Sequence, residues 1–455
     1  MPKYAKSINR VIKVKQGYIR GVPSGNPAYT VFKGVPYAKP PVGQYRFKHA
    51  QAVDNWEGIR DCTSFPNISI QNPWEEGSFY QKEFFCDPPR MSEDCLYLNI
   101  WTSDTSGTKR MPILFWIHGG GNVAGYSFEP EFDGEAFLRR GCILVTINYR
   151  LGVYGFFAHP ELTKRDGYSG NYGLSDIIKA LEWVNENAPA FGGDPDNITV
   201  FGQSAGGGLT KNLLMSKKAK GLYKRATVQS SGGIGSPGMT AALSQKEEIG
   251  KKAADAAGCT LDDMMHEDAF ELYKKLRTAA EESGARGPFS PCVDGLFLEE
   301  GLYETFTQGK YHDVDIMMGC VAGDNSLFGR DGVKMTRRIA EFGENAIKTG
   351  HKPMYLYYFD RMMPGDDAGA FHSAELWYVF GTLDRCWRAI EPGFTAGDWL
   401  LSNAMTDYWC AFAKTGDPNN AKQSKWQPYK GFGGRIMHMN ERIIAENDDS
   451  DIFAL

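Results

Sequence analysis

Several features that would assign a protein to other classes are missing from this sequence of 455 residues. No apolar run is long enough to cross a membrane, and no Pro/Ser-rich linker or low-complexity run divides the chain. No Cys/His set has zinc spacing, and no Gly-x-Gly-x-x-Gly follows a strand in a nucleotide-binding arrangement, so we expect neither a metal nor a cofactor. The net charge of −5 provides no basic surface for nucleic acid. We expect one domain over residues 1–455, as a monomer or a dimer.

Cysteines are few and their number, 9, is odd. Several lie in apolar surroundings, as Cys142 does, and no leader of charged and then apolar residues precedes the first strand-like segment. These features predict a cytoplasmic location with buried free thiols. A local pair between Cys86 and Cys95 is the alternative.

The segment 198–207, which reads ITVFGQSAGG, places a serine between two kinds of local pattern. Its first residues have the β-branched, apolar bias of a buried strand, and the leucines that follow it have helical spacing. Ser204 is therefore predicted at a sharp strand-to-helix corner, where Gly202 and Gly206 leave room for close backbone. The amide of Ala205 would lie at the helix start and face a developing oxyanion. An ordinary turn is the alternative interpretation of this segment alone.

A second motif strengthens the interpretation as a catalytic corner. The apolar run 111–117 has strand length, and three glycines follow it at 119–121. Glycines allow the backbone to turn its amides toward a substrate carbonyl oxygen, and Gly120 and Gly121 are the expected donors. A nucleophile together with such a pocket predicts acyl transfer.

A serine nucleophile needs a histidine base and a carboxylate that orients the histidine. The chain has 8 histidines, and in the α/β-hydrolase layout the acid and then the histidine follow the serine. His372 is favoured because its small-residue loop leads into an aromatic-rich segment. The acid is predicted as Asp324, in the loop after a strand at 314–319. A loop aspartate that only accepts local backbone bonds is the alternative. The other histidines after Ser204 are His266, His312, His351 and His438.

The pattern of apolar residues predicts an α/β fold with a mostly parallel central sheet flanked by helices. The helix after Gly173 has Leu174, Ile177, Leu181 and Val184 at helical spacing. A further helix is expected at 335–347. The expected strands, which alternate with helices, are 111–118, 142–149, 197–201, 225–230, 314–319 and 354–359.

Five further motifs resemble the type-B carboxylesterase and cholinesterase-like family of α/β-hydrolases, and the resemblance covers nearly the whole chain. They are residues 32–47 (FKGVPYAKPPVGQYRF), 92–101 (SEDCLYLNIW), 171–176 (NYGLSD), 191–199 (FGGDPDNIT) and 415–419 (TGDPN). The resemblance implies an α/β-hydrolase fold, a triad of Ser204, Asp324 and His372, and an oxyanion hole of Gly120, Gly121 and Ala205.

The chain also departs from the family pattern. Asp324 stands where the family usually has glutamate, and Gln203 replaces the commoner glutamate before the serine. The family's first disulfide would use Cys95, but residues 65–71, where its partner is usual, contain no cysteine. Asp324 and His372 are only 48 residues apart, about half the usual separation, which predicts a shortened helical cap and a wider or shallower mouth. The alternative is that the missing pieces were surface helices far from the pocket.

These observations predict a serine carboxylesterase acting on small to medium esters, aryl or short-chain acyl. A feruloyl or aryl esterase for bulky aromatic acids is the alternative, followed by a non-catalytic cholinesterase-like binding protein. Six residues next to the catalytic loops are candidates for lining the pocket, with a role in the core equally open: Tyr126, Phe128, Leu327, Phe328, Phe371 and Trp377.

Overall fold

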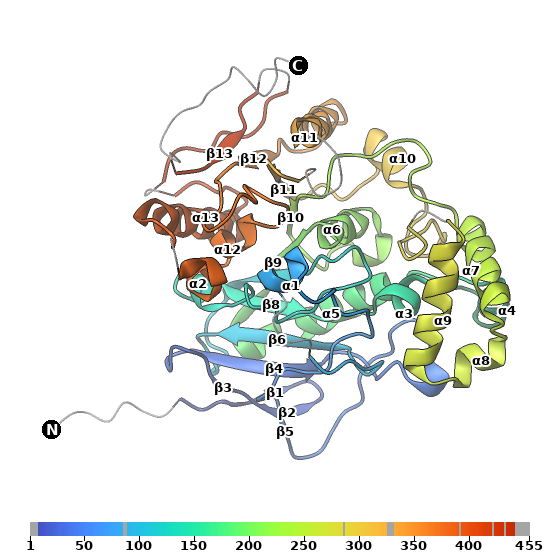
Figure 1. Cartoon of the computed structure of the whole chain (residues 1–455). Coiled ribbons are helices and arrows are strands. Elements are labelled where there is room, and N and C mark those ends of the chain that lie inside the picture. The colour runs from blue at the N-terminus through green and yellow to red at the C-terminus, as the bar shows by residue number, and fades with distance from the viewer. Residues whose placement is uncertain are drawn as a thin grey trace.

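The computed structural model describes residues 8–84, 89–284, 287–324, 332–390, 393–420, 423–431 and 434–441. Ten strands of this part of the chain form one large sheet (Figure 1). In spatial order they are β13 (Met437–Met439), β12 (Tyr355–Phe359), β11 (Asp315–Val321), β10 (Arg225–Gln229), β9 (Gly193–Gln203), β7 (Met111–Ile117), β8 (Ile143–Ile147), β6 (Tyr97–Thr102), β4 (Thr30–Pro36) and β3 (Val22–Pro23).

The sheet is mostly parallel, as expected. The six pairings from β13 to β8 are parallel, and β6, β4 and β3 continue the sheet in antiparallel pairings. All six expected strands are present, although β9 is longer than expected. A second sheet of β1 (Val11–Val14), β2 (Gly17–Arg20) and β5 (Ile59–Asp61) had no counterpart among the expected strands.

Alternate residues of β7 belong to two separate cores. Ile113, Phe115 and Ile117 are buried in one hydrophobic cluster, whereas Leu114 and Trp116 are buried in another. Because successive side chains of a strand point to opposite faces, the sheet has apolar residues on both faces and must be covered on both. This explains why β7 is an uninterrupted apolar run rather than an alternating one.

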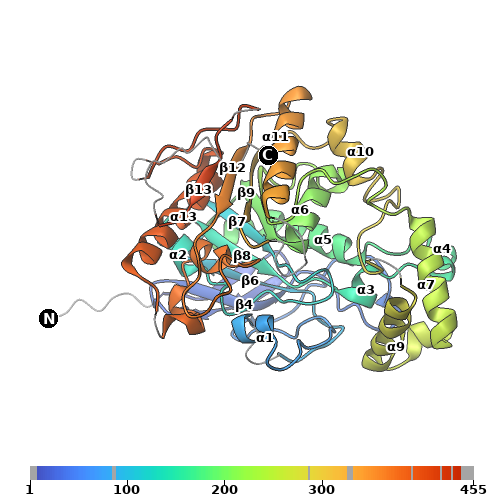
Figure 2. The same ribbon diagram turned by 45° about the horizontal axis from the view of Figure 1, so that its top comes forward.

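Helices cover the two faces, as Figure 2 shows. On one side lie α1 (Phe79–Phe84), α2 (Glu135–Leu138), α12 (Glu375–Val379) and α13 (Ala396–Thr415). On the other side lie α3 (Gly152–Phe156), α4 (Pro160–Asp166), α5 (Tyr172–Asn187), α6 (Ala205–Met215), α7 (Leu243–Ala257), α8 (Leu261–His266), α9 (Ala269–Glu282), α10 (Leu302–Thr307) and α11 (Gly332–Lys348). The predicted inner face of α5 and the predicted helix within α11 are confirmed.

The carboxyl ends of β7, β9, β10 and β11 meet at one edge of the sheet, because these neighbouring strands are parallel. The loops that leave this edge carry the glycine triplet, Ser204, residues 230–236 and Asp324. Ligands bind in α/β proteins at such an edge. Within the described residues, no helix is long and apolar enough to cross a membrane.

Candidate active site

Ser204 occupies the predicted corner between β9, which ends at Gln203, and α6, which begins at Ala205. Its φ of 55° and ψ of −123° are unusual for a residue with a side chain, and such strain is found at functional sites. The flanking glycines are required. A Cβ at Gly206 would lie 2.0 Å from the carbonyl oxygen of Ile117, and one at Gly202 would lie 2.5 Å from the backbone of Gly206.

The glycine triplet passes directly beside the serine. A Cβ on Gly119 would lie 3.2 Å from the Cβ of Ser204. Gly120 and Gly121 have φ values of 95° and 65°, which side chains rarely allow. The turn is fixed because the carbonyl oxygen of Gly120 accepts the amides of Val123 and Ala124, at 3.0 and 2.9 Å. The loop therefore brings Gly119 beside Ser204, next to the start of α6, where backbone amides lack helical partners.

Asp324 and His372 are brought together by their loops. The Nδ1 atom of His372 lies 2.6 Å from Oδ1 of Asp324. His372 is 8% exposed and Asp324 is 2% exposed. Beside this pair the amide of Gly323 donates to the carbonyl of Ala370, at 2.8 Å. The second oxygen of Asp324 accepts the amide of Val321, at 3.0 Å. Asp324 thus accepts a local backbone bond, as the alternative interpretation had it, and also holds the histidine.

The contacts of His372 fix how its ring can be protonated. Since Nδ1 faces the carboxylate of Asp324, the neutral ring carries its proton there and leaves a lone pair on Nε2. The side-chain nitrogen of Gln203 lies 3.3 Å from this Nε2 and can donate to it. The glutamine is therefore compatible with a histidine that accepts a proton through Nε2.

Electrostatics at His372 favour a proton on the ring once the reaction supplies one. Burial opposes the charge, but the hydrogen bond to Asp324, its charge and the charge of Glu375 outweigh burial, so the pKa of His372 is raised. Burial and the charge of Asp324 raise the pKa of Glu375 to about 7. Glu375 is fully buried and accepts a bond of 3.4 Å from Gln229.

The other four histidines that follow Ser204 in the sequence have different surroundings. His266 is exposed and contacts Asp262. His312 bonds the hydroxyl of Tyr223 at 2.8 Å, and burial with the charge of Lys220 lowers its pKa to about 4. The remaining two are His351, stacked on Tyr311, and His438, which lies 3.8 Å from Asp360.

Ser204, Asp324 and His372 line one cavity of about 280 Å³. Its walls include the segment after β10 and the apolar side chains of Met239, Leu302 and Met335. A second cavity of about 560 Å³ contains Trp74, Gln71 and Tyr126. It adjoins the glycine loop, because Gln71 bonds both the amide and the carbonyl of Gly125, at 2.8 and 3.0 Å.

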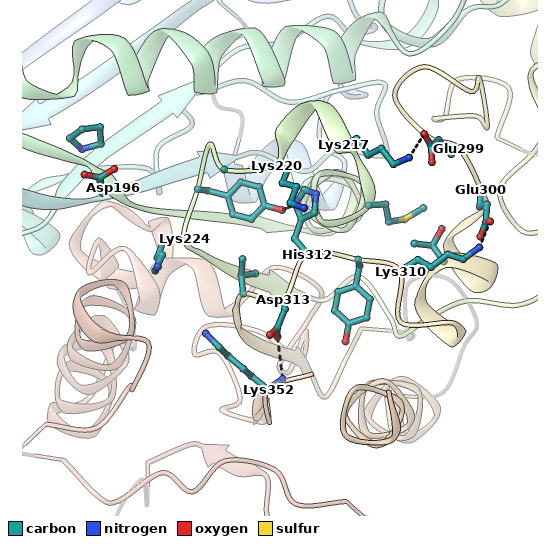
Figure 3. Close-up of a pocket in the computed structure, with 17 residues that line it drawn as sticks. Asp196, Lys217, Lys220, Lys224, Glu299, Glu300, Lys310, His312, Asp313 and Lys352 are labelled. Atoms are coloured by element: carbon teal, nitrogen blue, oxygen red, sulfur yellow. Dashed lines mark hydrogen bonds and ion pairs between the residues drawn. The ribbon is translucent and has the colours of Figure 1, made fainter. Parts of the chain in front are cut away.

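A larger cavity of about 990 Å³ lies at the opposite, amino edge of the sheet (Figure 3). Its lining includes Asp196 near the start of β9, Lys224 before β10 and Val314 before β11. Lys217 and Lys310 form ion pairs there with Glu299 and Glu300. This cavity is thus separated from Ser204 by the length of the strands.

The six residues that were predicted to line the pocket lie in different surroundings. Tyr126 lines the second cavity, and Phe128 stacks on Phe65 with ring centroids 4.5 Å apart. Phe371 and Trp377 are 1% and 0% exposed and pack against aromatic residues of α1. Leu327 and Phe328 lie outside the described residues, as does Cys86, whereas Cys95 is buried and free.

Three residues that contact the site were not predicted from the sequence. Glu375 follows His372 by one helical turn, a spacing that could have drawn attention to it. Lys211 lies on the cavity wall, and a lysine in an otherwise apolar helix was its only signal. Tyr80 donates its hydroxyl to the carbonyl of His372, at 3.3 Å, and no sequence pattern indicated this contact.

Comparisons with known proteins agree with the expected family. The chain matches the model of the Carboxylesterase family over residues 8–348 and 337–450. It is 30% identical to the para-nitrobenzyl esterase of Bacillus subtilis (strain 168), over 97% of this chain and 96% of that protein. It is 34% identical to an acetylcholinesterase of Leptinotarsa decemlineata, over 70% of this chain and 55% of that protein.

A solved structure of a thermophilic PNB esterase superimposes with a TM-score of 0.84 at 29% identity, covering 95% of this chain and 96% of that one. The expected α/β-hydrolase fold and the expected resemblance are both confirmed by these matches. The chain belongs to the type-B carboxylesterase family and is a carboxylic ester hydrolase.

Proposed function

We propose that the protein hydrolyses small to medium carboxylic esters through a triad of Ser204, His372 and Asp324 and an acyl-enzyme intermediate. The observation that carries this proposal is the 2.6 Å contact between His372 and Asp324, in a cavity that Ser204 also lines. A nucleophile at a strained corner, a base and a group that orients the base are the three parts that acyl transfer requires.

In the proposed reaction, Nε2 of His372 takes the proton of Ser204 while the serine oxygen attacks the ester carbonyl carbon. The amides of Gly120, Gly121 and Ala205 stabilise the negative oxygen of the tetrahedral intermediate. The imidazolium, stabilised by Asp324, then protonates the leaving alcohol as the carbon–oxygen bond breaks. The same histidine next deprotonates a water molecule, which attacks the acyl group and releases the acid from Ser204.

The cavities support esters of short acyl chains or aryl groups. The cavity of about 280 Å³ at Ser204 is at the lower end of the size of small-molecule sites. Trp74 and Tyr126 give the second cavity, of about 560 Å³, aromatic walls. The similar protein from Bacillus subtilis is a para-nitrobenzyl esterase, which agrees with an aryl group on one side of the ester. Bulky aromatic acids, the alternative class, would have to occupy the larger of these two cavities.

The first test is Ser204→Ala, with Ser236→Ala as a matched control on the same cavity wall. Loss of a triad nucleophile should lower kcat for p-nitrophenyl acetate by roughly 10⁴-fold or more. Ser236→Ala should keep most of the activity, since its hydroxyl is given no role. Both variants should keep the wild-type circular dichroism spectrum. Retention of about a tenth of the activity in folded Ser204→Ala would exclude the mechanism.

A substrate panel distinguishes the classes of ester. It consists of p-nitrophenyl esters of increasing acyl length, methyl ferulate and a triglyceride. The proposal predicts the highest kcat/KM with short acyl chains. A preference for methyl ferulate would favour the feruloyl esterase, and no turnover of any ester would favour the non-catalytic binding protein.

A further inference from the structure

Lys211 lies in the middle of α6, seven residues after Ser204, and its side chain is enclosed by protein. The residue is 4% exposed and lines the cavity that contains Ser204 and His372. No ion pair joins it to a carboxylate within the described part of the chain, and burial lowers its pKa to about 7. A buried lysine without a charged partner is costly, so its contacts call for an explanation.

The ammonium group of Lys211 donates to three successive backbone carbonyls. Its Nζ lies 2.7 Å from the oxygen of Ser231, 3.3 Å from that of Gly232 and 2.9 Å from that of Gly233. An ammonium group has three N–H donors, and the number of carbonyls matches the number of donors. The three carbonyls therefore point toward the side chain of Lys211 in α6.

Within the described residues, the three carbonyls of the segment 231–233 accept hydrogen bonds only from Lys211. Gly232 has a φ of 65°, and a Cβ there would meet nothing within 4 Å. The segment is wedged between two helices. A Cβ at Gly207 of α6 would lie 2.8 Å from the Cβ of Ser231, and one at Gly233 would lie 2.0 Å from the carbonyl oxygen of Arg338 in α11. Lys211 thus connects the helix that begins at Ser204 to the wall of the substrate cavity.

We propose that Lys211 is a positioning residue for substrate selectivity: its ammonium group holds the backbone of residues 231–233 and so sets the shape of the cavity wall that the ester contacts. The proposal rests on the proposed function, because it assumes that the ester binds beside Ser204. It assigns Lys211 no role in proton transfer. Loss of Lys211 should therefore alter the discrimination among esters more than the chemical step on the smallest ester.

The test compares Lys211→Met and Lys211→Gln with wild type and with Lys164→Met, which replaces an exposed lysine of α4. Methionine has similar length but no N–H donor, whereas glutamine keeps two donors. Two ester series are used. One varies the acyl chain of p-nitrophenyl esters from acetate to octanoate, and the other varies the alcohol of acetate esters. Circular dichroism and thermal unfolding report on folding.

For Lys211→Met we expect a changed selectivity, measured as a ratio of two kcat/KM values. Either the ratio between the octanoate and the acetate of p-nitrophenol, or the ratio between two alcohols of the acetate series, should change by about tenfold or more, mainly through KM. Its kcat for p-nitrophenyl acetate should stay within about threefold of wild type. Lys211→Gln should change the ratio less, and Lys164→Met should not change it. The series that responds identifies the part of the ester that contacts residues 231–233.

Unchanged ratios in both series, for both Lys211 variants, would overturn the proposal. If Lys211→Met does not fold, Lys211→Gln decides alone by the same criterion. Failure of the proposed triad mechanism is recognised separately. In that case Ser204→Ala, in a chain that keeps Lys211, would remain active.

Discussion

Replacement of Asp324 by asparagine should nearly abolish turnover, and the hydrogen bonds of the carboxylate explain why. Oδ1 accepts from His372, and Oδ2 accepts the amide of Val321, at 3.0 Å. Asparagine has only one side-chain oxygen, so it can serve one of these two donors. Serving His372 would leave the buried amide of Val321 facing an NH₂ group, which costs about 1–3 kcal/mol.

The favoured arrangement therefore directs the asparagine NH₂ group toward His372. The ring must then present its lone pair on Nδ1 and carry its proton on Nε2, where it cannot accept a proton from Ser204. An energy difference of about 1–3 kcal/mol between the arrangements reduces the active tautomer by about 5- to 160-fold, at 1.36 kcal/mol per tenfold. Loss of the charge that stabilises the imidazolium adds to this, for a total of about 10²- to 10⁴-fold in kcat with little change in KM.

The assay is steady-state hydrolysis of p-nitrophenyl acetate by the folded, purified variants. Asp315→Asn is the control, because Asp315 begins β11 at the far edge of the sheet and pairs with Lys352 at 2.9 Å. Asp324→Glu restores the residue usual in the family and should retain measurable activity if the loop can absorb one methylene. The reasoning would be refuted if Asp324→Asn stayed within about threefold of wild type, or if Asp315→Asn were inactive instead.

Two further predictions follow from the buried carboxyl groups. Because His372 must be neutral to act as a base, kcat/KM should rise with pH through a pKa above the ordinary histidine value of about 6.5. Glu375→Gln should move this rise to lower pH, because the charge of Glu375 raises the pKa of His372. A pH profile that Glu375→Gln leaves unmoved would contradict this assignment. Burial raises the pKa of Glu129 to about 8. The folded state therefore keeps a proton that the unfolded state loses at about pH 4.5. The free energy of unfolding should consequently fall as pH rises from about 5 to 8. Glu129→Gln should weaken this fall in urea titrations, and an equal fall in wild type and variant would count against the raised pKa.

The parts of the site that sequence analysis predicts are those with local requirements. The corner at Ser204 needs small residues at two fixed positions, so Gly202 and Gly206 mark it without knowledge of the fold. Asp324 could be proposed because a loop aspartate after a parallel strand must lie at the carboxyl edge, together with the loop after β9. The main strands were also predictable, since each buried strand is an apolar run of characteristic length.

Contacts between distant segments could not be predicted in this way. Gln203 contacts His372, which is 169 residues away in the sequence, and Gln229 contacts Glu375, which is 146 residues away. Neither separation belongs to a local pattern that the sequence could reveal. Lys211 was a lysine in a helix, and nothing in the sequence indicated that three carbonyls would enclose its ammonium group. The small sheet of β1, β2 and β5 is also long-range, because β5 joins β2 from about 40 residues away. How the shortened connection between Asp324 and His372 affects the mouth of the site stays a prediction.

The most direct test of the central claim is to identify the residue that forms the covalent intermediate. The protein is treated with diethyl p-nitrophenyl phosphate, released p-nitrophenolate is counted, and the modified peptide is sequenced by mass spectrometry. We predict one p-nitrophenolate per chain, complete loss of esterase activity, and a diethylphosphoryl group on Ser204, with no reaction in Ser204→Ala. A phosphoryl group on Ser230 or Ser231, which line the same cavity, or full activity in the absence of any adduct, would contradict the account.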